Sequence, residues 1–335
     1  MKFLSPMLIL LAFASQGWAQ QEDNALVKAR QLLKAQKNAE AITVLLALRA
    51  RRPELKGVNR ELGVAYYRES DFLEAAQYLQ EAWTEDPGDR DAVQLLGLSY
   101  YSSGRPTQAI PALEQVRAWY PGKNIDAIYI LGICYALAGR YTDARATFAK
   151  LFGENAESSA AHLITGRMLL RQGLDVAAEG EIKAALLISP QLPLAHLSLG
   201  EVHLFGGRYT EASDEFQAEL RVNPACAIAM THLGETFWRL KGDEESQRVS
   251  LRAISLEDTE AEPFVVLSKA QIRQGQWGLA EKDLRRALQL DHENYTAHFL
   301  LAQLYRDQGL IEASKREMEA AARIQRAVQR SASRN

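Results

Sequence analysis

The residues of this sequence best suited to chemistry are its six histidines, because imidazole binds metal ions and transfers protons near neutral pH. His196 and His203 are seven residues apart on one predicted helix, with Glu201 between them and His232 on a later one. Imidazole and carboxylate groups are common zinc ligands. Their spacing here matches no familiar ligand motif. A metal carrier or enzyme using His196, His203 and His232 is therefore the third of three hypotheses for this chain.

Other reactive groups give no sign of a catalytic site. The sequence has no glycine-rich phosphate-binding loop, no Gly-x-Ser-x-Gly turn and no His-Glu-x-x-His motif. Cys134 and Cys226 are too far apart in the repeat pattern below for a disulfide, so we expect two unpaired, buried thiols. Carboxylates such as Glu201 and Glu235 belong to successive helices. We expect no enzyme activity, cofactor, metal ion or small-molecule substrate.

Small side chains recur every 34 or 35 residues along the sequence. We call these nine sites the anchor positions: Ala29, Gly63, Gly97, Gly132, Gly166, Gly200, Gly234, Ser268 and Ala302. The residue twelve after each anchor is small again: Ala41, Ala75, Ala109, Ala144, Ala178, Ala212, Ser246, Ala280 and Ser314. The residue seven after the anchor is glycine in six repeats, which suits a left-handed turn: Gly104, Gly139, Gly173, Gly207, Gly275 and Gly309. Such a fixed period indicates a repeat protein.

Between these positions the apolar pattern is that of helices. Leu62, Tyr66, Ala75, Leu79 and Ala82 recur at three- and four-residue spacings on either side of a turn. Each repeat is therefore predicted to be a helix, a short turn and a second antiparallel helix. One such pair cannot bury its apolar face alone, so the pairs must stack in an all-α protein.

The repeat resembles the tetratricopeptide repeat. Its fullest copies are Leu62, Gly63, Tyr66, Ala75, Leu79, Ala82, Pro87 and Leu199, Gly200, Ala212, Phe216, Pro224. The resemblance covers nine repeats: 22–55, 56–89, 90–123, 125–158, 159–192, 193–226, 227–260, 261–294 and 295–328. It implies an α-solenoid, a right-handed superhelix whose role is to hold other proteins or peptide segments. Residues 329–335 are predicted to be a disordered basic tail.

Two repeats depart from this pattern. The fourth gains a residue near Lys123–Asn124 and has Ala156 in place of the closing proline. The seventh has Ser246, Ser250 and Asp258 where alanine, a large apolar residue and proline are usual. We expect the seventh repeat to pack least well.

Three histidines share one repeat position, four residues before the anchor: His162, His196 and His298. Other repeats have Val93, Ile128, Met230 or Phe264 there, so we interpret the position as structural.

A partner would bind on the side of each first helix that faces away from the packing positions. Residues three before, one after, and four to five after the anchor share that side, which lines the concave groove in stacks of this kind. The predicted groove residues are Arg60, Tyr67, Arg68, Tyr101, Tyr129, Arg167, Arg171, Trp238, Arg239, Lys269 and Arg273. Tyr, Trp and Arg dominate interface hot spots, so we expect a ligand segment with apolar anchors near carboxylates. A structural alternative stays open, because a cation in the last turn of a helix is favoured by the helix dipole alone.

The family's clamp for a peptide's terminal carboxylate is not reproduced. The matching places hold Arg60, Val64, Gln94 and Leu98, which disfavours a receptor for chaperone tails.

The first nineteen residues resemble a secretory signal. Lys2 precedes an apolar run over residues 7–14, and Gly17 and Ala19 are small residues at the predicted cleavage site. We expect an exported scaffold, periplasmic or secreted, that organises an envelope or secretion-related assembly. The second hypothesis is an assembly factor anchored in the inner membrane by an uncleaved segment at residues 3–19. The net charge of −3 gives no general attraction to nucleic acid.

Overall fold

The computed structural model describes residues 24–121 and 124–332. The predicted signal peptide at residues 1–19 lies outside them. Within the described residues, every regular element is a helix, and the helices follow one another in nine pairs. The predicted all-α stack of helix pairs is confirmed.

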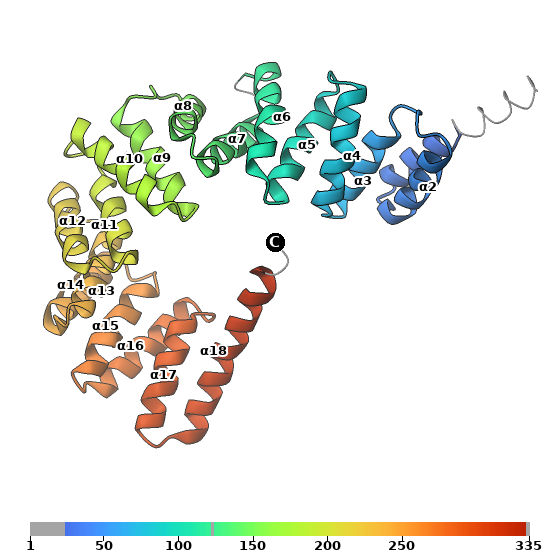
Figure 1. Cartoon of the computed structure of the whole chain (residues 1–335). Helices are drawn as coiled ribbons and strands as arrows, with labels where there is room; N and C mark the ends of the chain where they lie inside the picture. Colours follow the sequence, from blue (N-terminus) through green and yellow to red (C-terminus); the bar gives the residue numbers. More distant parts are fainter. Residues whose placement is uncertain (1–23, 122–123, 333–335) are drawn as a thin grey trace, which may run out of the picture. The chain divides into compact units, whose positions relative to one another are not determined.

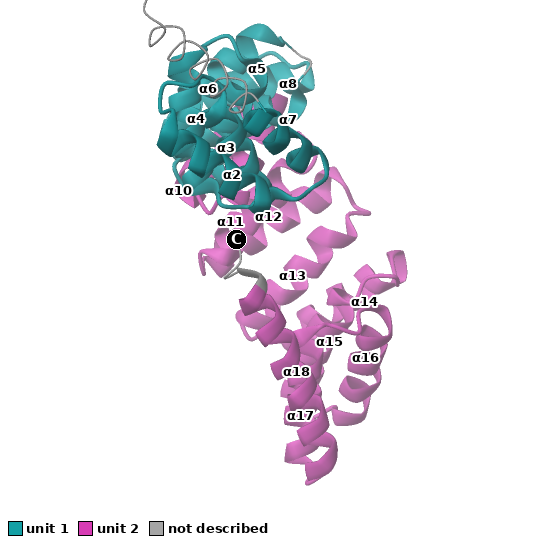
Figure 2. Ribbon diagram, turned by 90° about the vertical axis from the view of Figure 1, so that its right-hand side faces the viewer, with its two compact units in different colours: residues 1–157 teal, residues 158–335 magenta. Residues whose placement is uncertain are grey.

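The chain divides into two compact units (Figure 2), unit 1 at residues 1–157 and unit 2 at residues 158–335. Unit 1 contains a helix at residues 24–34, α2 (Asn38–Arg51), α3 (Val58–Arg68), α4 (Phe72–Glu85), α5 (Arg90–Ser102), α6 (Pro106–Trp119), α7 (Ile125–Leu137) and α8 (Tyr141–Phe152). Unit 2 contains α9 (Ser159–Arg171), α10 (Asp175–Ile188), α11 (Ala195–Phe205), α12 (Tyr209–Val222), α13 (Ala227–Arg239), α14 (Asp243–Leu256), α15 (Glu262–Arg273), α16 (Trp277–Leu290), α17 (Tyr295–Asp307) and α18 (Ile311–Ala332).

Within each unit the pairs stack by one rule, which Figure 1 shows along the chain. A first helix such as α5 packs against its own second helix α6, the preceding second helix α4 and the preceding first helix α3. In unit 2, α15 contacts α16, α14 and α13 in the same way. First helices therefore form one continuous layer in each unit and second helices form the other.

The turn between paired helices is left-handed, as predicted. All six glycines seven residues after an anchor have positive φ, between 69° at Gly173 and 77° at Gly309. The equivalent residues of three other repeats, Gln36, Ser70 and Lys241, have φ of 61°, 63° and 63°. The left-handed conformation costs a residue other than glycine roughly 1 kcal/mol. The packing of the stack therefore imposes this turn even at these three residues, whose side chains disfavour it.

The anchors are small because a large side chain of the second helix lies directly against them. A Cβ on Gly63 would lie 2.4 Å from Cγ of Leu79, and one on Gly132 would lie 2.5 Å from Cε1 of Phe148. The alanines twelve residues after the anchors are fully buried, as at Ala75. The close approach of the two helices of a pair thus explains why small residues recur at these two positions of each repeat.

The last helix differs from its predicted end. α18 has 22 residues and continues to Ala332, so residues 329–332, expected in a disordered tail, are helical. Among the described residues, no helix is long and apolar enough to cross a membrane.

Candidate functional site: the faces of the first helices

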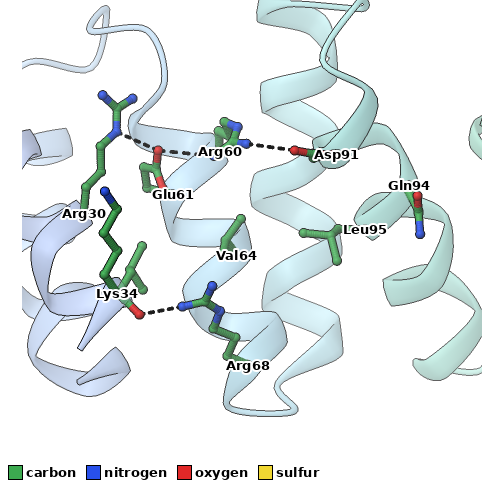
Figure 3. Close-up of a pocket in the computed structure, with 10 residues that line it drawn as sticks. Arg30, Lys34, Arg60, Glu61, Val64, Arg68, Asp91, Gln94 and Leu95 are labelled. Carbon is green, nitrogen blue, oxygen red and sulfur yellow. Dashed lines mark hydrogen bonds and ion pairs between the residues drawn. The ribbon is translucent and has the colours of Figure 1, made fainter. Parts of the chain in front are cut away.

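Unit 1 carries a hollow of about 610 Å³ on its first three repeats. Figure 3 shows the side chains that line it, contributed by the helix at residues 24–34 and by α3 and α5. The lining residues are Arg30, Leu33, Lys34, Arg60, Glu61, Val64, Arg68, Asp91, Gln94 and Leu95. Four cations and two carboxylates give the hollow a net positive charge.

Most of these cations are already bound within unit 1. Arg30 Nε lies 2.8 Å from Oε1 of Glu61, and Arg60 Nε lies 2.6 Å from Oδ2 of Asp89. Arg68 Nη1 donates at 2.6 Å to the carbonyl of Leu33, near the end of the preceding first helix, and the same carbonyl also accepts from the backbone N–H of Gln36. Arg30, Arg68 and, through Asp91 at 3.7 Å, Arg60 therefore link neighbouring repeats, and all three guanidinium groups already have hydrogen-bond or ion-pair partners.

Lys34 is the exception in the hollow. Its side chain is exposed and forms no hydrogen bond or ion pair with the residues that the structure describes. Arg30 and Lys34 were not among the predicted groove residues. The same rule, one and five residues after the anchor Ala29, applied to the first repeat would have found both.

The predicted tyrosines of unit 1 do not line the hollow. Tyr67 packs edge-on against Phe72 with ring centres 5.5 Å apart, and burial raises its pKa. Tyr129 packs against Phe148 at 6.0 Å, and burial also raises the pKa of Tyr101. These half-buried rings strengthen contacts inside unit 1.

Unit 2 begins with two predicted cations that have no internal partner. Arg167 and Arg171 are exposed, four residues apart on α9, and neither makes a hydrogen bond or ion pair within the described ranges 24–121 and 124–332. On the neighbouring α11, Phe205 is 71% exposed. Arg171 and Phe205 hold the same repeat position, five residues after the anchor. The face of α9 and α11 therefore combines two unpaired guanidinium groups with an exposed aromatic ring.

The other predicted residues of unit 2 form one cluster around Trp238. Cζ of Arg239, Cζ of Arg273 and Nζ of Lys269 lie 4.9, 4.7 and 5.3 Å from an indole ring centre. Glu235 neutralises two of these cations, with 2.9 Å to Arg239 and 2.8 Å to Lys269. Arg273 Nη2 donates to the carbonyl of Trp238 at 2.8 Å, the same link that Arg68 makes in unit 1. The cluster is a preformed aromatic surface whose charges are largely compensated.

The three histidines at the packing position each face a carboxylate of their own repeat. Nδ1 of His162, His196 and His298 lies 2.7, 2.6 and 2.5 Å from the nearer carboxylate oxygen of Glu181, Glu215 and Glu317. Nε2 of His196 also faces the carbonyl of Pro190 at 3.2 Å. The side chains therefore join first and second helices, in agreement with a structural role.

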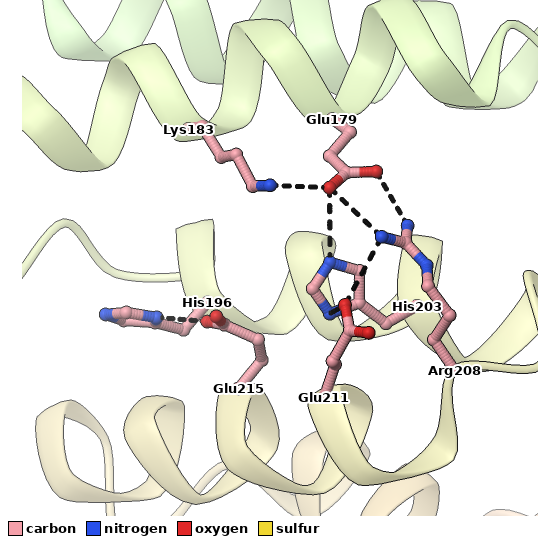
Figure 4. Close-up of polar contacts among 7 residues, drawn as sticks. All are labelled: Glu179, Lys183, His196, His203, Arg208, Glu211 and Glu215. Carbon is pink, nitrogen blue, oxygen red and sulfur yellow. Dashed lines mark hydrogen bonds and ion pairs between the residues drawn. The ribbon is translucent and has the colours of Figure 1, made fainter.

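The structure also separates the residues of the metal hypothesis. His203 lies 3.5 Å from Glu179 and 3.8 Å from Glu211, at ion-pair distance but without hydrogen-bond alignment (Figure 4). His232 faces Glu201 at 3.4 Å. Across residues 24–121 and 124–332, no group of three or more His, Cys, Asp or Glu side chains could hold a metal ion. The metal hypothesis finds no site in this part of the chain.

Both cysteines are free and buried, as predicted. Burial raises the pKa of Cys134 to about 12, so its thiol is not a nucleophile at neutral pH.

Stacked helix pairs, with aromatic and cationic side chains along their first helices, define this chain as a helical repeat protein. A tetratricopeptide repeat model matches residues 26–90, 197–246 and 265–334, more than half of the chain, and another matches 66–121 and 100–168. The chain belongs to the tetratricopeptide repeat family.

The chain is also similar to individual proteins over part of its length. The TPR repeat-containing protein YvcD of Bacillus subtilis (strain 168) is 29% identical over 123 residues, 36% of this chain and 25% of YvcD, so the chain spans a quarter of that relative. The structure of YrrB, titled a TPR protein with an unusual peptide-binding site, is 19% identical with a TM-score of 0.44 over 54% of this chain and 93% of YrrB. The Cut9–Hcn1 structure is 15% identical with a TM-score of 0.46, over 84% of this chain and 55% of its own.

Proposed function

We propose that this chain is a non-catalytic scaffold that binds extended or helical segments of partner proteins on the faces of its first helices. The bound segments carry an apolar anchor next to carboxylates. The pair Arg167 and Arg171 beside Phe205 carries this proposal, because it combines unpaired charge with exposed aromatic surface.

Charge pairing decides which predicted residues contribute most to binding. Arg60, Arg68, Arg239, Lys269 and Arg273 all have partners inside their own unit, so a ligand would have to compete for them. Arg167 and Arg171 have none among the described residues, and an arginine binds a carboxylate through two parallel hydrogen bonds. An apolar side chain of the partner then covers Phe205, whose ring is otherwise left in water.

Trp238 supplies a second, weaker contact in this proposal. Its ring already contacts the guanidinium groups of Arg239 and Arg273, so it offers a rigid surface that loses little entropy on binding. In the hollow of unit 1, Lys34 is the cation that forms no hydrogen bond or ion pair with the described residues, and this region contributes least.

A pull-down with paired variants tests the proposal. The chain captures partners from a cell-envelope extract, and their yields are measured by quantitative mass spectrometry. Arg167→Ala combined with Arg171→Ala should lower the yield of the specific partners about tenfold, and Trp238→Ala combined with Arg239→Ala should lower it less.

The control changes two exposed cations that lie on second helices. Arg248→Ala combined with Lys282→Ala removes the same charge, and neither side chain has a partner within the described residues. If the α9 double variant recovers the same partners at the same yield as the control, the first-helix face is not where they dock.

The compartment is part of the proposal and rests on the sequence of residues 1–19. A signal peptide there would place the scaffold in the periplasm or outside the cell, with a role in envelope or secretion-related assembly. The intact mass of the protein purified from the envelope tests this. Loss of these residues supports the exported scaffold, and their retention supports the membrane-anchored assembly factor.

A further inference from the structure

Unit 1 has a second cavity, of about 420 Å³, lined by the second helices α6 and α8 and by the first helix α7. α7 packs against both second helices and contributes the buried ring of Tyr135. None of the predicted groove residues lines this cavity. Its volume is in the range of pockets that bind small ligands, roughly 300–1,000 Å³.

The carboxylates of this cavity already have partners. Nε of Arg140 lies 2.7 Å from Oδ2 of Asp143, and Nη2 of Arg140 lies 3.8 Å from Oε1 of Glu114. The hydroxyl of Tyr135 donates a hydrogen bond to the same Glu114 oxygen. Arg140 and Tyr135 thus compensate both acidic groups.

Two cations in the cavity have no carboxylate partner in the described part of the chain. Arg117 makes long contacts to neutral groups, from Nη1 to the hydroxyl of Thr147 at 3.5 Å and from Nη2 to that of Tyr135 at 3.4 Å. Its Cζ also lies 5.9 Å from the ring centre of Tyr135. Lys150 is exposed and forms no hydrogen bond or ion pair with the described residues. Three cations and two carboxylates leave the cavity with one uncompensated positive charge.

The first and second repeats have a carboxylate at the position of Lys150. Arg49 and Arg117 both follow their anchors by twenty residues, and Glu81 and Lys150 both follow the next anchor by eighteen. Nη2 of Arg49 donates to the two carboxylate oxygens of Glu81 at 3.0 and 2.7 Å. In the third and fourth repeats the arginine is kept, but a lysine replaces the carboxylate. A carboxylate from outside the chain would therefore have the role of Glu81.

Stacking of the repeats does not require these two cations. In unit 2, a cavity of about 490 Å³ lies at the equivalent junction, with Tyr305 at the position of Tyr135. The residues equivalent to Arg117 and Lys150 there are Leu288 and Ala320. The fold thus accepts uncharged residues at both positions, and the unpaired cations are particular to the cavity of unit 1.

We propose that this cavity of unit 1 binds one carboxylate that is joined to an apolar group. Arg117 and Lys150 donate hydrogen bonds to the carboxylate. The apolar group covers Ile125, which is 60% exposed at the edge of the cavity, beside Leu151. A free organic acid and the acidic side chain of a bound peptide segment share this chemistry.

This inference does not depend on the proposed function. The cavity uses no residue of α9, α11 or the Trp238 cluster, so variants of one site leave the other intact. Loss of partner capture and loss of carboxylate binding are therefore separate outcomes.

The test is ligand-observed nuclear magnetic resonance of the full chain with phenylacetate. We expect saturable binding, at least about tenfold tighter than that of the neutral analogue phenylacetamide, which lacks the charge that the cations bind. A capped tripeptide of leucine, glutamate and leucine distinguishes the two sources. Binding of phenylacetate assigns the site to free acids, and binding of the tripeptide alone assigns it to a peptide segment.

The decisive variant is Lys150→Glu, which places a carboxylate of the chain itself where Glu81 lies in the second repeat. It should weaken binding of the probe at least about tenfold, and Arg117→Gln should do the same because it removes the guanidinium donor. The matched control is Lys282→Glu, the same charge change at an exposed residue of α16, which should leave binding unchanged. Circular dichroism checks that each variant stays helical.

Two results would overturn the proposal. One is that neither phenylacetate nor the tripeptide binds at up to about 10 mM. The other is that a bound probe has the same affinity for the Lys150→Glu and Lys282→Glu variants, because the cavity is then not where it binds.

Discussion

In the sixth repeat, α11 and α12, a phenylalanine fills the space beside the anchor, whereas the seventh repeat, α13 and α14, has a serine at that position. A Cβ on Gly200 would lie 2.5 Å from Cε1 of Phe216, which is fully buried. A Cβ on Gly234 would lie 2.7 Å from Oγ of Ser250 and 3.2 Å from Cγ1 of Val266, which belongs to α15. The sixth repeat fills its own core, and the seventh takes part of its apolar cover from the eighth.

Two buried serines of the seventh repeat also lack side-chain hydrogen bonds to the described residues. The hydroxyls of Ser246 and Ser250 are buried and have no partner among the described residues. Ser314, at the position of Ser246 in the ninth repeat, donates to the carbonyl of Ala302 at 2.7 Å. A serine in this core is therefore not costly in itself, and the cost in the seventh repeat comes from the missing acceptors.

The junctions on either side differ in charge. Glu179 of the fifth repeat holds Arg208 of the sixth at 2.6 Å, with Lys183 at 2.6 Å from the same carboxylate (Figure 4). In the seventh repeat the equivalent residue is Gln247, which donates to Gln276 of the eighth at 3.2 Å. At this repeat position the link before the sixth repeat is ionic and the link after the seventh is neutral, although Glu235 and Lys269 form an ion pair elsewhere in the junction after the seventh repeat. We therefore expect the sixth repeat to be more stable than the seventh.

The largest loss of stability is expected from substitution of Phe216. Phe216→Ala should lower the free energy of unfolding by about 3–5 kcal/mol, because it leaves a cavity beside Gly200. Urea denaturation followed by circular dichroism measures the loss, and hydrogen exchange in α11 and α12 localises it. A loss below about 1 kcal/mol would mean that neighbouring side chains refill the space.

The anchor glycines should respond unequally. Gly200→Ala drives a methyl group into the ring of Phe216 and should cost about 1–3 kcal/mol. Gly234→Ala meets the Ser250 hydroxyl, which can rotate, and a methyl group of Val266 at 3.2 Å, while it gains about 1 kcal/mol of helix propensity, so its loss should be smaller than that of Gly200→Ala. Thermal unfolding of the two variants side by side checks the difference. Equal losses would show that both anchors are equally confined.

Acid should weaken the ionic junction selectively. Hydrogen bonds from Arg208 and Lys183 hold the pKa of Glu179 at about 2, below its usual 4.5. The ionised form therefore favours the folded state, an effect complete above about pH 4.5 and lost as the pH falls toward 2. Glu179→Gln should remove about 1 kcal/mol at pH 7 and flatten the stability profile between these pH values. Gln247→Ala is the control, and its effect should not vary with pH.

The smallest expected effect is a gain in stability. Ser250→Ala removes a buried hydroxyl without a partner and should stabilise the chain by up to about 1 kcal/mol. Ser314→Ala is the counterpart that removes a satisfied hydroxyl, and it should destabilise. Differential scanning calorimetry resolves the two shifts in melting temperature. Destabilisation by Ser250→Ala would indicate that its hydroxyl has found an acceptor.

The sequence predicted the fold because fold information here is local and periodic. Small anchors such as Gly63, turn glycines such as Gly104 and helical spacing of apolar residues all act within one repeat. The last turns of α18 were missed because residues 329–332 carry no apolar pattern that distinguishes a free helix from a frayed end.

The faces of the first helices were predicted less completely, for a physical reason. Repeat position tells which side of a helix a residue occupies, but not whether its charge is already used. Arg68 and Arg171 hold the same position, yet Arg68 binds the carbonyl of Leu33 and Arg171 has no partner in the described residues. That distinction depends on side-chain conformations in the adjacent repeat.

The spacing of the polar links has a use in engineering. Glu179 with Arg208 and Gln247 with Gln276 are both separated by 29 residues and hold the same two repeat positions. Gln247→Glu combined with Gln276→Arg would introduce the same ionic link at the junction after the seventh repeat. A repeat stack of this kind can therefore be stiffened at a chosen junction by exchanging two side chains, with its backbone left as it is.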